Sequence, residues 1–185
     1  EKPARLDRSE GDVHPDGNPH VHLDPRNILT LAKVAAGRLK AIDPSNAAAY
    51  DSGLAEFSSR WRTALAGWEV RAKRLSGMPV VVHHRSWSYL IGWIGLAPVA
   101  SLEPKPGIPP TASHLRDVLE AVRGKNVKAV LRTPFDPSDA SEWLSGKTDI
   151  PALVLPFTID PEGGVPDLFA LFERILSSLE KARGG

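Results

Sequence analysis

Five of the six histidines of this 185-residue chain lie in two short segments. His14, His20 and His22 lie in the first segment, which is rich in proline, glycine and aspartate, and His83 and His84 lie in the second. Imidazole is the commonest protein ligand for zinc and similar metals. The clustering therefore predicts a binding site for a divalent transition metal.

The first segment allows two interpretations. His20 and His22 form a His-x-His pair that prolines bracket, and such a pair either binds a metal or consists of two solvated loop histidines. His14 lies in a His-Pro-Asp-Gly sequence that is typical of an ordinary turn, so it is a weaker candidate.

The second segment follows a short run of valines. His83 and His84 point to opposite faces if that strand continues, so we expect at most one of them to bind metal and the other to be a buried, hydrogen-bonded residue. Asp160 is either a carboxylate ligand or a turn-capping aspartate. Arg85 and Glu103 are candidates for groups that support the ligands, although nothing in the sequence places them there.

Several other chemistries are excluded or unsupported. The sequence has no cysteine, which excludes thiolate ligands, disulfides and cysteine nucleophiles. It has no nucleophile-elbow or phosphate-binding glycine motif. The net charge of +1 provides no field for holding nucleic acid, so we expect no nucleic-acid partner. We also recognise no signal peptide and no apolar run of the ~20 residues that span a bilayer.

The candidate ligands need a rigid scaffold, and the sequence predicts an α/β fold. Short apolar runs at 80–83, 97–102, 127–131 and 152–155 alternate with helical patterns, one of which we expect Asp136 and Pro137 to begin. This alternation predicts a four-stranded parallel sheet with helices on both faces. Ligands of such sheets bind beyond the carboxyl ends of the strands, where His84 and Asp160 would lie.

A long helix precedes the sheet. After a first helix that ends at Asp43 and Pro44, apolar residues at helical spacing run from Tyr50 to Leu75. Ser45 is the expected N-cap and Gly77 the expected stop. About 30 residues would span about 45 Å. The helix either packs on the sheet or acts as a strut that supports a second lobe.

Four segments resemble the solute-binding proteins of zinc and manganese ABC transporters, of the cluster A-I type. Residues 17–25 (Gly-Asn-Pro-His-Val-His-Leu-Asp-Pro) are similar to the family's segment before a helix, and residues 43–50 resemble its entry to a long helix. Residues 84–89 (His-Arg-Ser-Trp-Ser-Tyr) match its His-x-x-Trp-x-Tyr segment, and residues 103–115 match its proline-rich loop. The resemblance covers nearly the whole chain.

The resemblance implies a ligand set. His20 and His84 fall on the family's second and third histidine ligands, and Asp160 best matches its carboxylate ligand. His22 stands where the family usually has Trp, so it is an auxiliary candidate, as is His14. The intact protein would hold a divalent transition metal with three imidazoles and one carboxylate, and would deliver it to an ABC permease. Zinc is the favoured metal and manganese the second choice. It would be periplasmic or an extracellular lipid-anchored protein, and not an enzyme.

The family also has two lobes, and its first histidine ligand comes from an N-terminal lobe that we do not find here. We therefore expect residues 1–43 to be the end of that lobe with the metal-binding loop and first helix, 44–77 the connecting helix, and 78–185 the C-terminal α/β lobe. This chain should bind metal weakly, and its exposed helix face should self-associate or bind the missing lobe.

Two alternatives remain open. The order His-x-His, His and Asp is also that of metal-dependent hydrolases with an amidohydrolase barrel, although such barrels typically need about 250 residues. The other alternative is a flavodoxin-like interaction module with incidental histidines.

Overall fold

The computed structural model describes residues 18–184, so His14 lies outside the described residues. The helices are α1 (Pro25–Ile42), α2 (Ala47–Leu75), α3 (Ser88–Ile94), α4 (Ala112–Val122), α5 (Asp139–Thr148) and α6 (Leu168–Gly184). The strands are β1 (Pro79–Val82), β2 (Ala97–Ser101), β3 (Ala129–Arg132) and β4 (Ala152–Val154). Three short 3-10 turns matter for the site or for helix entry: η2 (Val21–Leu23), η3 (Pro44–Asn46) and η4 (Arg85–Trp87).

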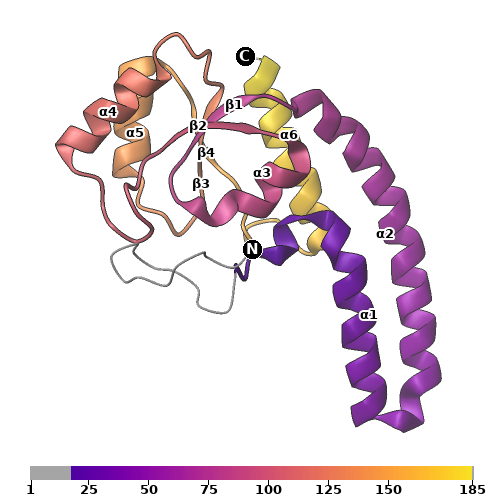
Figure 1. Cartoon of the computed structure of the whole chain (residues 1–185). Coiled ribbons are helices and arrows are strands. Elements are labelled where there is room, and N and C mark those ends of the chain that lie inside the picture. Colours follow the sequence, from indigo (N-terminus) through magenta and orange to yellow (C-terminus); the bar gives the residue numbers. More distant parts are fainter. Residues whose placement is uncertain (1–17, 185) are drawn as a thin grey trace.

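The four strands form one parallel sheet in the order β2-β1-β3-β4, which confirms the predicted class. Strand residues alternate between the two faces. Val80 and Val82 face a core shared with α2, α3 and α6, whereas Val81 faces a second core shared with α4 and α5. Figure 1 shows the resulting layers, with α4 and α5 on one side of the sheet and α6 and α2 on the other.

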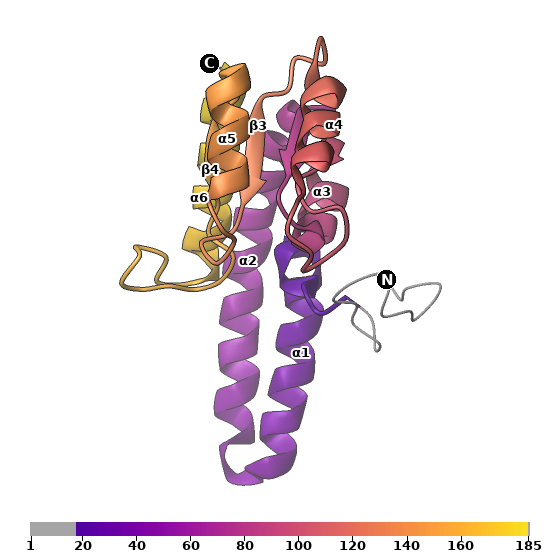
Figure 2. The ribbon, with the colours of Figure 1, turned by 90° about the vertical axis from the view of Figure 1, so that its left-hand side faces the viewer.

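The long helix packs on the sheet over only part of its length. Its second half packs in the core, where Trp61, Trp68 and Leu75 are buried, and Trp61 Nε1 donates to the carbonyl oxygen of Pro25 at 2.9 Å. Its first half extends beyond the sheet as a hairpin with α1 (Figures 1 and 2). None of the helices in residues 18–184 is both long and apolar enough to cross a membrane.

The α1 helix carries apolar side chains that the described residues leave exposed. Leu31, Val34, Leu39 and Ile42 are all more than two-fifths exposed, and Ile42 reaches 81%. Soluble proteins seldom expose several large apolar side chains on one element without a partner surface. The hairpin therefore offers an uncovered apolar surface outside the core.

Two predicted helix caps are wrong. Ser45 does not cap α2, because η3 occupies Pro44–Asn46 and α2 begins at Ala47. Instead Ser45 donates to Asp43, which also accepts from Asn46 and Tyr50. These hydrogen bonds, from Asn46 first, hold the pKa of the Asp43 carboxyl below its ordinary value.

The second wrong cap concerns α5. Asp136 was expected to begin it, but the helix begins at Asp139. The Asp136 carboxylate accepts from the backbone N–H of Thr133 at 2.6 Å, so it closes a turn that precedes the helix. The expected stop at Gly77 is confirmed, because Gly77 has the positive φ of +74° that favours glycine at a helix end.

Candidate metal centre

The predicted ligand segments meet at one edge of the sheet. His83 and His84 follow the last residue of β1, and the loop that carries Asp160 follows β4. Parallel strands bring their carboxyl ends to the same edge of the sheet, the open edge, so both segments lie there. The η2 turn, which begins just after His20, packs against α3 at the same end of the molecule. The fold thus places all three predicted ligands at one end of the described structure.

His84 has a defined ring orientation. Its Nδ1 lies 2.6 Å from Glu103 Oε2, and its side chain is 22% exposed. An ionised carboxylate can only accept a hydrogen bond, so Nδ1 carries a proton, and in the neutral imidazole Nε2 then keeps its lone pair. Metal-binding histidines are commonly oriented by such a carboxylate on the other ring nitrogen. The arrangement therefore prepares His84 Nε2 to bind a metal.

His83 turns the other way. His83 is 2% exposed, and it lines a pocket of about 490 Å³ beside α4 and α5. Its Nε2 lies 3.8 Å from Glu103 Oε1. Its burial was expected, but within residues 18–184 its Nδ1 finds no hydrogen-bond partner. His83 is thus shielded from the open edge on which His84 lies.

Phe157, which the sequence does not single out as a site residue, joins the two histidine segments. Its ring makes edge-to-face contacts with His20 at 5.1 Å between centroids and with Trp87 at 5.5 Å. It also contacts the ring of His22, whose Nε2 donates to the carbonyl oxygen of Phe157 at 2.9 Å. Trp87 belongs to η4, which directly follows His84. The loop after β4 thus positions the His20 segment beside the His84 segment.

The backbone around His20 is held by local hydrogen bonds. Its N–H donates to Asn18 Oδ1 at 3.0 Å, and its carbonyl oxygen accepts from Leu23 N–H at 3.0 Å. Asp24 then caps α1 by accepting from the N–H of Arg26 at 2.9 Å. Pro25 at the first helical position suits this entry. His20 therefore sits on a short rigid turn that is fixed to the start of α1.

Asp160 completes a turn of its own loop. Its backbone pairs with Val165 in an antiparallel bridge, and its Oδ1 accepts from Gly163 N–H at 3.0 Å. A side chain at Gly163 would collide with the Asp160 carboxylate, so glycine is required for this close approach. The residue is exposed. Asp160 thus makes the contacts of a turn-capping aspartate, which is the second of the two roles that its sequence allows.

The three predicted ligands share an edge without forming a ligand cluster. In the described part of the chain, no group of three or more His, Asp or Glu side chains is placed to hold a metal ion. His20 packs on Phe157, His84 bonds to Glu103, and Asp160 bonds to Gly163. Binding of one ion by all three side chains would require at least the contacts of His20 or Asp160 to rearrange, whereas the Nδ1 contact of His84 leaves its Nε2 available.

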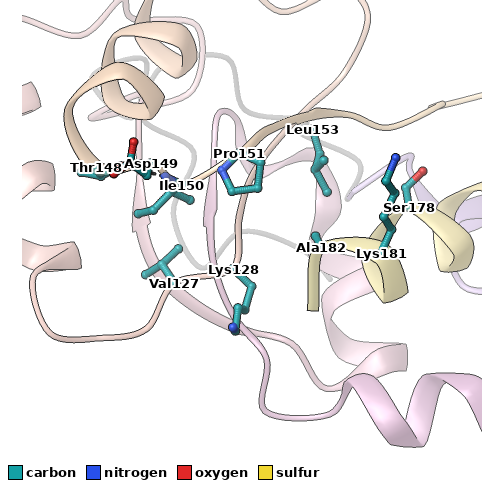
Figure 3. Close-up of a pocket in the computed structure, with 10 residues that line it drawn as sticks. All are labelled: Val127, Lys128, Thr148, Asp149, Ile150, Pro151, Leu153, Ser178, Lys181 and Ala182. Carbon is teal, nitrogen blue, oxygen red and sulfur yellow. Dashed lines mark hydrogen bonds between the residues drawn. The ribbon is translucent and has the colours of Figure 1, made fainter. Parts of the chain in front are cut away.

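A second pocket lies at the opposite edge of the sheet. It measures about 630 Å³ and is lined by residues before β3 and β4 and by the end of α6. Figure 3 shows its two lysines, Lys128 and Lys181, together with the one carboxylate, Asp149. No histidine lines it. This pocket lacks the donor set of a transition-metal site.

The open parallel sheet, the histidines at its carboxyl edge and the helical hairpin that extends beyond it agree with the solute-binding proteins that the sequence resembles. The chain belongs to the family described as zinc-uptake complex component A, periplasmic (ZnuA), which matches residues 2–182. The resemblance recognised in the sequence is thereby confirmed.

Individual relatives are distant. The high-affinity zinc uptake system protein ZnuA of Brucella abortus (strain 2308) is 22% identical over 160 residues, covering 86% of this chain and 48% of that protein. The same protein of Brucella suis biovar 1 matches equally. This chain thus spans about half the length of these relatives.

Solved structures show the same fold. A cadmium-bound periplasmic metal binding protein from Candidatus Liberibacter asiaticus superimposes with a TM-score of 0.73 at 20% identity, covering 92% of this chain and 65% of the other. The manganese complex of FpvC from Pseudomonas aeruginosa gives a TM-score of 0.69 at 24% identity, with 90% and 62% covered.

Proposed function

We propose that this chain forms one metal-binding wall of a periplasmic or lipid-anchored solute-binding protein, which captures a divalent transition metal and passes it to an ABC permease. The observation that carries the proposal is the His84–Glu103 pair, because it presents His84 Nε2 as an oriented ligand at the open edge. Family membership supports the transport role. The role is binding and release, without catalysis.

The proposed ligands are His84, His20 and Asp160, and the ion is the cargo. Because these side chains are not clustered in residues 18–184, we propose that the site is completed when a second lobe closes on this edge and supplies a further imidazole. Nitrogen-rich ligation gives a site a higher affinity for zinc than for the harder manganese, and a carboxylate oxygen reduces that difference in affinity. The Brucella relatives are zinc uptake proteins, whereas structural neighbours bind cadmium or manganese. We therefore favour zinc, with manganese second.

The auxiliary candidate His22 has a different proposed role. Its Nε2 donates to Phe157, which leaves only Nδ1 for a metal. We propose that His22 braces the η2 turn and thereby holds His20 in place. A metal-dependent hydrolase is less favoured, because the described sheet is open and has four strands where an amidohydrolase barrel has eight.

The exposed apolar side of α1 fits a protein surface. Leu31, Val34 and Ile42 lie on the hairpin that extends from the lobe. We propose that a second lobe covers this surface in the intact protein, and that copies of this chain associate through it when that lobe is absent.

Zinc titration of the chain and of single-residue variants tests the proposal. We expect weak binding by the chain, with a Kd above about 1 μM, equivalent to about −8 kcal/mol. His84→Ala should weaken it at least about tenfold, and His20→Ala and Asp160→Asn should also weaken it. The matched control is His114→Gln, because His114 is not a proposed ligand and its Nε2 already bonds to the carbonyl oxygen of Ser101 at 2.9 Å.

Two results would contradict the proposal. One is that His84→Ala leaves the zinc affinity unchanged. The other is that His114→Gln reduces the zinc affinity as much as His84→Ala does. Circular dichroism of each variant shows whether the fold is retained, so that a lost ligand is distinguished from unfolding.

A further inference from the structure

We propose that Glu103 is a positioning residue that sets the tautomer and the ring orientation of His84, and thereby the affinity for the metal. The inference rests on the proposed function of His84 as a ligand. It adds a residue that does not itself touch the ion, and it assigns to one carboxylate the task of holding the ligand ring and the adjacent loop together.

The Glu103 carboxylate is shared between the ring and the loop. Oε2 accepts both from His84 Nδ1–H at 2.6 Å and from the backbone N–H of Gly107 at 2.9 Å. The Glu103 side chain is 13% exposed. A short hydrogen bond to a charged, shielded acceptor is stronger than a neutral one in water. The carboxylate therefore restrains both the His84 ring and the loop residues 103–107.

The sheet itself fixes the backbone on which this pair sits. The register that pairs Val82 with Ser101 continues beyond the strands. Leu102 N–H donates to the carbonyl oxygen of Val82 at 2.8 Å, and Glu103 N–H donates to that of His83 at 3.1 Å. Both members of the pair thus extend from neighbouring parallel strands. Their separation is set by backbone pairing and does not depend on a mobile loop.

The other carboxylate oxygen faces a second imidazole. Glu103 Oε1 lies 3.8 Å from Nε2 of His83, whose side chain is 3% exposed. A carboxylate with one oxygen held by His84 and Gly107 and the other beside a buried ring has little freedom to rotate. This arrangement explains why one carboxylate can select a single His84 tautomer, with the proton on Nδ1 and the lone pair on Nε2.

The loop after Glu103 fits the same task. Residues 103–110 contain four prolines, which restrict the backbone. Gly107 has a φ of +76°, which favours glycine and lets its N–H reach the carboxylate. The loop thus closes back on Glu103 and shields the hydrogen bond to His84 from competing solvent.

The test is a nitrogen-15 NMR measurement on the metal-free chain with labelled histidine, at a pH where the imidazoles are neutral. In the wild-type chain we expect His84 Nδ1 to give a protonated-type resonance and Nε2 an unprotonated-type resonance. Glu103→Gln keeps the size but loses the charge, so it should mix the two tautomers. Glu103→Ala removes the acceptor and should shift the ring toward the Nε2–H form, which predominates in free histidine.

Zinc titrations of the same proteins complete the test. We expect Glu103→Ala to weaken zinc binding about 10- to 100-fold, as other supporting carboxylates do, and Glu103→Gln to weaken it less. The matched control is Glu120→Ala on α4, whose exposed carboxylate pairs with Arg123 away from the site. It should leave both the tautomer and the affinity unchanged.

The outcomes separate this inference from the proposed function. A His84 tautomer that Glu103→Ala leaves unchanged overturns the positioning role, whatever the zinc affinity. A tautomer that shifts while zinc affinity stays constant overturns the link to affinity. If zinc binds without moving the His84 resonances in the wild-type chain, His84 is not a ligand and the proposed function fails, whereas the tautomer measurement still decides what Glu103 does to the ring.

Discussion

His22 Nε2 donates a 2.9 Å hydrogen bond to the carbonyl oxygen of Phe157, across 135 residues of sequence. This bond joins the η2 turn to the loop that follows β4. It places the segment of His20 beside the open edge of the sheet, where Phe157 also contacts Trp87, three residues after His84. The geometry of the proposed metal wall therefore depends on residues that do not bind the ion.

The first prediction concerns that bond. His22→Ala should lower the free energy of unfolding by about 1 kcal/mol, the usual contribution of one hydrogen bond. It should weaken zinc binding about tenfold or less, because His20 is less well held. Urea unfolding and zinc titration measure the two effects. His22→Gln, which keeps an N–H donor, should restore much of both. Complete loss of binding in His22→Ala would instead make His22 a direct ligand.

The second prediction concerns the attachment of the hairpin to the lobe. Trp61 is fully buried and donates to Pro25 at the start of α1. Trp61→Phe should destabilise the chain by about 1–3 kcal/mol, because a buried carbonyl loses its partner and a void remains. Trp143→Phe, at a partly buried position on α5, should lower the free energy of unfolding by less. Thermal or urea unfolding measures both losses, and equal losses would argue that Trp61 does not attach α1 to the core.

The third prediction concerns pH and the contact between α2 and α6. Arg71 bonds to Glu180 at 2.7 and 2.9 Å and also pairs with Glu173. The hydrogen bonds from Arg71 lower the pKa of Glu180 below its ordinary value of 4.5. A carboxyl whose pKa is lower in the folded state stabilises the fold above its unfolded pKa, and this stabilisation is lost as the pH falls through the folded pKa.

Arg71→Met should therefore flatten the decline of the unfolding free energy below about pH 4.5. The effect should be small, about 1 kcal/mol or less, because the pair is partly exposed to solvent. Urea titrations at neutral pH and at several acidic pH values measure it. Wild-type and variant curves that remain parallel down to the acid transition would show that this contact contributes nothing to the pH dependence.

The fourth prediction concerns the exposed side of α1. The chain should self-associate at high concentration through Val34 and Ile42, which are 59% and 81% exposed. Ile42→Lys should reduce the association, because it places a charge in the apolar surface. Val70→Lys, on an exposed position of α2, is the matched control. Light scattering gives the molecular mass, and a monomeric wild-type chain at all concentrations would contradict the expectation.

Much of the fold follows from periodicity in the sequence. Short apolar runs place all four strands, and the spacing from Tyr50 to Leu75 predicts the long helix, because these patterns repeat over many residues. The caps at Ser45 and Asp136 were wrong because several neighbouring polar residues could fill the same role. Only the three-dimensional turn decides among them, and it assigns the nearby aspartates to turn hydrogen bonds.

The site was less accessible to sequence reasoning than the fold. His20, His84 and Asp160 could be proposed from residue type and position, but the contacts that hold them are long-range. Glu103 lies 19 residues from His84, and the sequence alone does not place it on the ring nitrogen. Phe157, three residues after the end of β4 at Val154, looks like an ordinary core residue in the sequence. Its contact with two distant histidines depends on how the loops meet.

The most direct test is anomalous scattering from crystals of this chain soaked with zinc. The account predicts a peak about 2.0–2.1 Å from His84 Nε2, the usual zinc–imidazole distance, with His20 or Asp160 turned toward the same ion. Zinc bound only at His114 or at scattered surface sites, with His84 Nε2 unligated, would contradict it.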